Sequence, residues 1–389
     1  MNRIYELKRH LKLEFPQNPI KGSGAIFLWG PRQTGKTTFL QGHYKDAHYY
    51  DLLDSSLIGE FTIRPQTLRE EVLADNRNIV IIDEIQKAPA LINEVHWLLE
   101  NTNKKIILCG SSARKLKRDA HNLLGGRAID AHLFPFVSSE IPDIDLDRFL
   151  NHGGLPAHYL NDNPRKLMKA YINNYIKEEI LEESITRNIP AFSRFLEITG
   201  LTHGQLLNYA NIAREAGVSP ITVRNYYQIL IDTLLGFTLE PWRRTKKRRL
   251  VETAKFYIFD IGIAHYLNPE ITSVMPGTDI YGRAFEHFLI NEIRAYLSYH
   301  DLDIPLSFWR TSSGFEVDLI LGDMEVAIEF KSSTRVTSND LKGIRALQDE
   351  HQVKRCIIVS REEKPRLANN IEIMSWKKFC SLLWSQEVI

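Results

Sequence analysis

A glycine-rich stretch near the N-terminus has the residue types of a phosphate-binding loop. It reads Gly-Pro-Arg-Gln-Thr-Gly-Lys-Thr and fits the pattern G-x-x-x-x-G-K-[ST]. The apolar residues 25–29 before it predict a buried strand, and a helix is expected to open near Thr38. Between a strand and a helix, the backbone N–H groups of such a loop cradle phosphates. The residues predicted to contact a nucleotide are Gly30, Pro31, Arg32, Gln33, Thr34, Gly35, Lys36, Thr37 and Thr38.

Two acids supply the other half of a nucleotide-hydrolysing site. Lys36 is predicted to contact the β- and γ-phosphates, and the Thr37 hydroxyl to hold Mg²⁺. The apolar residues 79–82 predict a second strand and end in Asp83 and Glu84. Asp83 is expected to hold Mg²⁺ through water and Glu84 to polarise the attacking water, so ATP and Mg²⁺ are the predicted cofactors. The alternative is that both acids only cap the helix that follows.

Polar residues also follow a third apolar run, residues 105–109. Ser111 is the predicted sensor of the γ-phosphate, with Ser112 beside it. Arg114 and Arg127 are candidate arginine fingers, acting in cis or from a neighbouring subunit. A surface ion pair explains either arginine equally well. Because strands alternate with helices, the sequence predicts a doubly wound α/β sheet with these motifs at the carboxyl ends of its strands.

The bulk composition restricts the class of protein. A chain of 389 residues predicts two to four domains. Hydrophobic residues make up 43% and charged residues 25%, which is ordinary for a soluble protein, and a net charge of +1 indicates no partner. Three cysteines without a C-x-x-C pair argue against a disulfide framework or a zinc ribbon. With no apolar run long enough to span a bilayer, a cytoplasmic protein with no membrane partner is expected.

Several motifs in order resemble one family of ATPases. The stretches GPRQTGKTT, IVIIDEIQ, ILCGSSARKL, LLGGRAI and FLNHGGLP together resemble the AAA-type ATPases common in bacteria and archaea. The resemblance implies ATP hydrolysis, often by a homo-oligomer, and a C-terminal α/β domain of the restriction-endonuclease-like kind. We therefore expect a P-loop ATPase core over residues 1–142, a helical lid over 143–192, a winged helix over 193–270 and a nuclease-like domain over 275–389.

A helix-turn-helix pattern lies in the middle of the chain. One predicted helix ends at Gly217, and Ser219 is a good N-cap for the next. Apolar residues define the buried face of the second helix, which leaves its polar residues exposed. Those predicted to contact phosphates and base edges of DNA are Thr222, Arg224, Asn225 and Gln228.

A basic run follows between two predicted strands, residues 237–242 and 255–259. Placed after a helix-turn-helix, this arrangement is typical of a winged helix whose wing contacts phosphates. The wing residues predicted to bind DNA are Arg243, Arg244, Lys246, Lys247, Arg248 and Arg249. Two alternatives stay open: a solvated loop, or a winged helix that only joins domains or subunits.

Four residues of the last domain match the pattern of a metal-dependent nuclease. Glu286 lies within the apolar face of a predicted helix, and Asp318 lies on a predicted strand. Glu329 and Lys331 are two residues apart on the next strand, so they face the same side. This D…E-x-K arrangement predicts that the three carboxylates hold Mg²⁺ and that Lys331 stabilises charge during phosphodiester cleavage. The alternative is a pair of compensating edge-strand charges.

Together these motifs predict an ATP-driven machine that remodels or translocates on DNA and binds or cuts it with its C-terminal domain. Branched DNA is one substrate class that the sequence allows without selecting it. A second interpretation is a nucleotide-switched regulator whose last two domains bind partners without catalysis. A third is a defence or mobile-element nuclease gated by ATP, which requires an intact Glu329 and Lys331.

Overall fold

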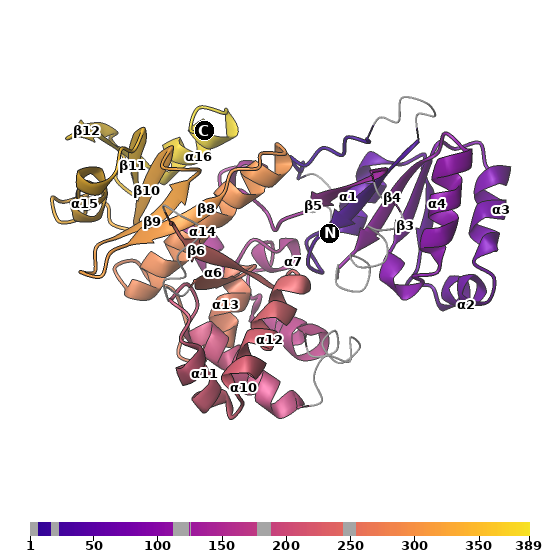
Figure 1. Ribbon diagram of the computed structural model, residues 1–389, viewed down its shortest axis with the longest axis horizontal. Helices are drawn as coiled ribbons and strands as arrows, with labels where there is room; N and C mark the ends of the chain where they lie inside the picture. Colours follow the sequence, from indigo (N-terminus) through magenta and orange to yellow (C-terminus); the bar gives the residue numbers. More distant parts are fainter. Residues whose placement is uncertain (1–6, 17–22, 112–123, 125, 177–187, 244–253) are drawn as a thin grey trace. The chain divides into compact units, whose positions relative to one another are not determined.

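The computed structural model describes residues 7–16, 23–111, 124, 126–176, 188–243 and 254–389 (Figure 1). The chain divides into two compact units. The first consists of Met1–Pro135 with Asp232–Leu234, and the second of Phe136–Ile231 with Leu235–Ile389. None of the described helices is both long and apolar enough to cross a lipid bilayer.

The first unit is built on a five-stranded parallel sheet in the order β2-β3-β4-β1-β5. Its strands are β1 (Gly24–Trp29), β2 (His48–Asp51), β3 (Ile79–Asp83), β4 (Lys105–Gly110) and β5 (Ala128–His132). Its helices are α1 (Lys36–His43), α2 (Ser55–Ile63), α3 (Gln66–Ala74), the 3₁₀ turn η2 (Ile85–Lys87) and α4 (Leu91–Asn101). The three strands predicted from the apolar runs are confirmed as β1, β3 and β4, and α1 opens two residues earlier than expected.

Helices cover the central strands, as Figure 1 shows for α3 and α4, which lie side by side. Every residue of β1 is buried, as expected for a central parallel strand covered on both faces. Leu68 of α3 and Leu91 of α4 belong to the same buried cluster as Phe27 and Trp29 of β1. This packing fixes the carboxyl end of β1, from which the glycine-rich loop departs.

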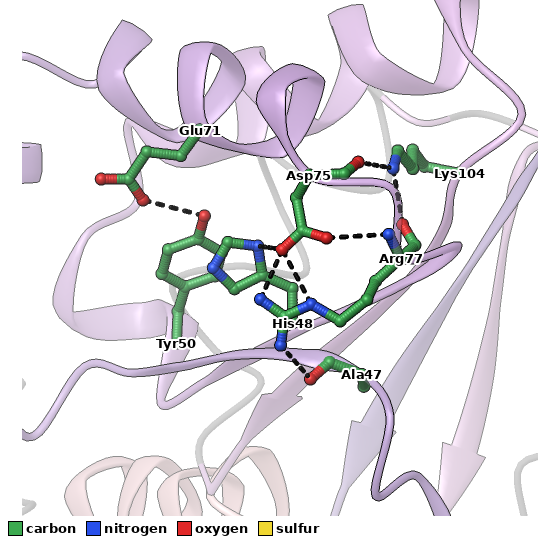
Figure 2. A network of polar contacts seen from close by, with 7 residues as sticks. All are labelled: Ala47, His48, Tyr50, Glu71, Asp75, Arg77 and Lys104. Carbon is green, nitrogen blue, oxygen red and sulfur yellow. Dashed lines mark hydrogen bonds and ion pairs between the residues drawn. The ribbon is translucent and has the colours of Figure 1, made fainter.

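A polar network ties the edge strand β2 to α3 (Figure 2). The Tyr50 hydroxyl donates to Glu71 Oε2 at 2.9 Å, and His48 Nδ1 lies 2.9 Å from Asp75 Oδ2. Arg77 donates to the same Asp75 carboxylate through both its side chain and its backbone N–H, which lowers the pKa of Asp75. The network holds β2 in register at the edge of the sheet.

The second unit contains an eight-stranded mixed sheet and most of the helices. The strands are β6 (Gly236–Pro241), β7 (Lys255–Ile258), β8 (Leu306–Arg310), β9 (Glu316–Leu321), β10 (Val326–Lys331), β11 (Arg355–Ser360), β12 (Arg366–Ala368) and β13 (Ile371–Ser375). The helices before the sheet are η3 (Ser138–Glu140), α6 (Leu146–His152), α7 (Pro156–Tyr159), α8 (Arg165–Ala170), η4 (Tyr171–Ile176), α10 (Ile189–Leu201), α11 (Tyr209–Ala216) and α12 (Pro220–Asp232). The later helices are α13 (Ile261–Leu267), α14 (Asp279–Tyr299), α15 (Lys342–Glu350) and α16 (Trp376–Trp384).

The hairpin expected to form a wing is part of the C-terminal sheet. The strand order is β12-β13-β11-β10-β9-β8-β6-β7, so β6 and β7 form one end of it. β6 pairs with β7 in the antiparallel sense and with β8 in the parallel sense, with Glu240 opposite Ser307. Both predicted strands exist, but their backbone pairing joins the region predicted as a winged helix to the region predicted as nuclease-like.

The two helices of the predicted helix-turn-helix form as expected. Gly217 ends α11 with a φ of 71°, a left-handed conformation that favours glycine. Ser219 Oγ accepts from the backbone N–H of Thr222 at 3.1 Å, which caps α12. The buried side of α12 packs its aromatic residues against α10, where Phe195 contacts the Tyr226 ring.

A buried aspartate explains the stretch FLNHGGLP. Asp260 Oδ2 accepts from the backbone N–H groups of Gly154 at 2.8 Å and Leu155 at 3.2 Å, and its Oδ1 accepts from Ile263 at 3.1 Å. A Cβ on Gly153 would lie 2.3 Å from the same carboxylate, and its φ is 79°. Burial raises the pKa of Asp260 to about 6 even though these three donors act in the opposite direction. The residues of this stretch therefore stabilise the packing of α6 against α13 in this unit.

His158 makes the second unit sensitive to acid. It is fully buried, and neither ring nitrogen has a hydrogen-bond partner among the described residues. Burial lowers its pKa to about 4, below the unfolded value of about 6.5. The unfolded chain therefore binds the proton first as the pH falls, and stability is lost between these two values. From pH 7.5 to 5.0 we expect His158 to cost about 2 kcal/mol of unfolding free energy.

His158→Leu should remove that share of the loss and leave the stability at pH 7.5 equal or higher. Urea unfolding at the two pH values measures both quantities. The exposed His43, changed to Gln, is the control and should unfold like the wild type. An unchanged loss on acidification in His158→Leu would contradict the assignment.

Candidate functional site

The glycine-rich loop closes around the Lys36 ammonium. Lys36 Nζ donates to the carbonyl oxygens of Gly30 at 2.7 Å and Pro31 at 3.1 Å, and its side chain is buried. Thr34 Oγ1 also donates to the Pro31 carbonyl, at 2.8 Å. The loop thus holds a positive charge at its centre, where the phosphates of a nucleotide would lie.

Close packing and backbone conformation explain the two glycines of the motif. A Cβ on Gly30 would lie 2.6 Å from the Leu133 carbonyl oxygen, so no larger residue fits there. Gly35 has a φ of 93°, and Gln33, which is not glycine, has a φ of 62°. A non-glycine residue held in the left-handed region is typical of functional loops.

Asp83 and Thr37 meet at the carboxyl end of β3. The Thr37 hydroxyl donates to Asp83 Oδ2 at 2.7 Å, and the Tyr49 hydroxyl donates to the same oxygen at 2.5 Å. Burial, followed by the Asp83 charge, raises the pKa of Tyr49, which therefore remains a donor. Thr37 and Asp83 supply the hard oxygen ligands that Mg²⁺ prefers. Tyr49 was not expected from the sequence, because only the parallel pairing of β2 with β3 brings it there.

Glu84 is held by two polar neighbours. Its φ is 57°, and its Oε2 accepts from Gln86 Nε2 and lies 3.4 Å from Ser111 Oγ. Gln86 Nε2 also lies 3.3 Å from Ser111 Oγ, which links β3 to the end of β4. A Cβ on Gly110 would lie 2.8 Å from Gln86 Oε1, so a larger residue there would displace the Gln86 amide. Gln86 was missed in the sequence, where the only signal was its position two residues after the acid pair.

Among the other residues predicted for this region, Arg127 has a partner outside the site. Arg127 forms an ion pair with Glu100 of α4. A surface ion pair was the alternative to an arginine finger at this position. Arg114 lies outside the described residues. Arg32 and Thr38 are partly buried on the loop and in the first turn of α1.

The C-terminal sheet brings Asp318, Glu329 and Lys331 together. Lys331 Nζ lies 2.6 Å from Glu329 Oε1, and Asp318 Oδ2 accepts from the backbone N–H of Phe330 at 2.8 Å. Glu329 is 6% exposed, and its Oε2 has no hydrogen-bond partner in the described part of the chain. Burial raises the pKa of Asp318 well above its usual range, and the Glu329 and Glu286 charges raise it further. The Lys255 and Lys331 charges act in the opposite direction without cancelling this rise in the pKa.

Glu286 points into the same region but is held by β7. Its Oε1 accepts from Tyr257 Oη at 2.6 Å and lies 3.2 Å from Lys255 Nζ. Lys255 also lies 2.6 Å from Glu316 Oε1. Within the described ranges, no group of three or more His, Cys, Asp or Glu side chains is arranged to hold a metal ion. The three predicted carboxylates therefore do not form one common ligand set, and Lys255 and Tyr257 were missed because β7 was expected in another domain.

The predicted DNA-binding residues of α12 lie mainly on its surface. Arg224, Asn225 and Gln228 are exposed, and Thr222 is partly buried. The Arg224 guanidinium lies 5.0 Å from the centre of the Tyr209 ring. Arg243 is partly buried after β6. The other wing residues, Arg244, Lys246, Lys247, Arg248 and Arg249, lie outside the described residues.

Comparison with known proteins identifies the first part of the chain. Residues 22–142 match the family model described as "AAA domain". This region is therefore similar to an AAA domain, and the name AAA domain refers to residues 22–142 from here on. The match and the loop geometry together support nucleotide hydrolysis. Residues 143–273 and 281–379 match two further models, each described as a domain of unknown function, DUF8612 and DUF4143.

Two relatives of similar sequence carry the name uncharacterized protein. An uncharacterized protein of Mycobacterium tuberculosis is 25% identical, with 89% of this chain and 78% of that one aligned. An uncharacterized protein of Methanocaldococcus jannaschii is 24% identical, with 92% of this chain and 85% of that one aligned. The solved structure of C. elegans PCH-2 matches at 14% identity with a TM-score of 0.22, over 53% of this chain and 61% of that one.

An arginine from the N-terminal segment contacts the loop of the AAA domain. Arg9 Nη1 donates to the Thr34 carbonyl at 2.9 Å. Its Nη2 donates to the Phe134 carbonyl and lies 3.4 Å from the Pro135 carbonyl. One guanidinium group thus joins the phosphate-binding loop to the segment after β5. No local pattern in the sequence marks this residue.

Proposed function

We propose that the protein hydrolyses ATP to drive an action on DNA. The observation that carries the proposal is the contact of Thr37 with Asp83, beside a Glu84 side chain that Gln86 and Ser111 orient. A carboxylate held next to the Mg²⁺ ligands has a role only where water attacks a phosphate. Binding alone would not require it.

The residues of the AAA domain have distinct roles in this reaction. Backbone N–H groups of the loop and the Lys36 ammonium bind and orient the phosphates. Thr37 and Asp83 would hold Mg²⁺, which neutralises phosphate charge when bound. Glu84 accepts the proton of the attacking water, and Ser111 contacts the γ-phosphate.

The second unit supplies the proposed contact with DNA. Arg224, Asn225 and Gln228 lie exposed on the second helix of a capped helix-turn-helix. Such side chains suit phosphates and base edges, and branched DNA is included among the proposed substrates. We also propose that the protein works as a homo-oligomer in the cytoplasm, where its three buried, unpaired cysteines would remain reduced.

The C-terminal site is proposed to be nuclease-like. Strands β9 and β10 are antiparallel, β10 and β11 are parallel, and Asp318 and Glu329 lie on the first pair. The unpartnered Glu329 Oε2 and the raised pKa of Asp318 both fit one divalent cation between these carboxylates. Lys331 would then stabilise the charge on a phosphodiester.

The experiment that tests the proposal measures ATP hydrolysis with and without linear and branched DNA, and examines the DNA on a denaturing gel. Stimulation by DNA that disappears in Glu84→Gln would support a DNA-dependent ATPase, and Mg²⁺-dependent nicks would support the nuclease-like site. Tight nucleotide retention without stimulation or DNA binding would overturn the proposal in favour of a nucleotide-switched regulator.

Arg224→Ala is expected to weaken DNA binding. Loss of one phosphate contact should reduce the slope of log affinity against log salt by about 1. Titration of labelled duplex at several salt concentrations measures this slope. Lys354→Ala is the control, because it also removes one positive charge. That side chain is 76% exposed and lies just before β11, outside the helix-turn-helix. An equal, small effect of both substitutions would argue against DNA contact through α12.

A further inference from the structure

A buried lysine lies inside the acidic site of the second unit. Lys255 is 5% exposed and comes from the first position of β7. Its ammonium contacts Glu286 of α14 and Glu316 of β9, at 3.2 and 2.6 Å. Three separate elements of the fold therefore converge on one ammonium group.

The Glu286 carboxylate also accepts a hydrogen bond from a second residue of β7. Tyr257, two residues after Lys255 on the same face of β7, donates its hydroxyl to Glu286 Oε1 at 2.6 Å. The same oxygen thus receives both donors from β7. An oxygen with two such partners has little capacity left for a metal ion.

The charged groups around this site also indicate that Glu286 is not free to bind a metal ion. Four carboxylates, from Glu286, Glu316, Asp318 and Glu329, face the ammonium groups of Lys255 and Lys331, and the Arg310 guanidinium lies 3.1 Å from Glu316 Oε2 at the edge of the site. Lys255 forms ion pairs with Glu286 and Glu316, whereas Lys331 forms an ion pair with Glu329. Of these four carboxylates, Glu329 has a buried oxygen, Oε2, without a hydrogen-bond partner among the described residues.

We propose that the Lys255 ammonium is a built-in cation of this site, which holds Glu286 and prevents it from binding a divalent metal. The site then takes one divalent cation, at Asp318 and Glu329, and Lys255 occupies the place of a second. A second divalent ion within contact distance of the ammonium would be repelled by it. The inference rests on the proposed metal site at Asp318 and Glu329.

The test is a titration of the nucleotide-free, full-length protein with Mn²⁺, followed by electron paramagnetic resonance. Glu329→Gln defines the binding that belongs to this site, because it leaves the P-loop ligands in place. We expect Glu286→Gln to leave the Mn²⁺ affinity of the wild type within about threefold, since Glu286 is not a ligand. Lys255→Gln should raise the affinity about tenfold or more by releasing Glu286 and removing a repelling charge.

Two further variants distinguish this effect from a general change in charge. Adding Glu286→Gln to Lys255→Gln should abolish the gain, because the gain requires the released carboxylate. Lys255→Arg keeps the charge and should bind Mn²⁺ like the wild type. If Glu286→Gln weakens binding in the wild type as much as Glu329→Gln does, or if Lys255→Gln changes nothing, the inference is wrong.

A failure of the proposed metal site gives a different result. In that case the wild type shows no Mn²⁺ binding that depends on Glu329. The inference about Lys255 is then supported if Lys255→Gln creates binding that needs both Glu286 and Glu329, and overturned if it does not.

Discussion

Glu84→Gln is expected to lower the turnover of ATP by about 10²–10⁴-fold while ATP still binds. The glutamine keeps the size of the side chain but cannot accept the proton of the attacking water. The loop and Lys36 supply most of the proposed phosphate contacts, whereas the Glu84 side chain is held by Gln86 and Ser111. Binding and chemistry are therefore expected to separate in this variant.

Single-turnover hydrolysis and the binding of a fluorescent ATP analogue measure these two effects. Glu70→Gln is the matched control, because it makes the same chemical change at an exposed position of the same domain. It should hydrolyse ATP like the wild type. Turnover in Glu84→Gln within about threefold of the wild type would remove Glu84 from the reaction and leave its left-handed backbone without a catalytic explanation.

The sequence predicted the AAA domain well because its signals are local. A buried strand, a glycine-rich turn and a helix start lie within one short stretch, so their chemistry can be recognised without knowing the fold. Tyr49 and Arg9 were not predicted, because each reaches the site from another strand or segment. Their positions depend on how the sheet assembles, which no periodicity in the chain encodes.

The second unit shows the same limit of prediction from sequence, here for the pairing of whole strands. The strands predicted over residues 237–242 and 255–259 form over residues 236–241 and 255–258, but their neighbour in the sheet was not predicted. Pairing between strands far apart in the sequence follows from burial and register rather than from local pattern. For that reason Lys255 was not considered together with Glu286, which lies 31 residues later in the sequence. Their side chains nevertheless touch.

Lys255→Gln is expected to lower the unfolding free energy by up to about 3–5 kcal/mol, because it removes a buried ammonium from the partly buried Glu286 and Glu316 carboxylates, of which only Glu316 keeps a second cation, Arg310. Although burial alone would lower the pKa of Lys255, the Glu286, Asp318 and Glu316 charges raise it, so the ammonium is charged throughout the neutral range. Urea unfolding of the full chain at pH 7.5 measures the loss. Lys354→Gln is the control, since its pair with Glu325 spans 3.8 Å with the lysine 76% exposed, and it should cost less than about 1 kcal/mol.

The double variant Lys255→Gln/Glu286→Gln decides whether the cost comes from the ion pair or from packing. If an unpaired charge is responsible, removing Glu286 as well should recover about 1–3 kcal/mol, because the second substitution removes the charge that the first one exposed. If the lysine stem only fills space, the two costs should add. Additive costs, or a Lys255→Gln loss equal to that of Lys354→Gln, would show that Lys255 does not neutralise this site, whereas recovery would show that the fold depends on a cation at this position.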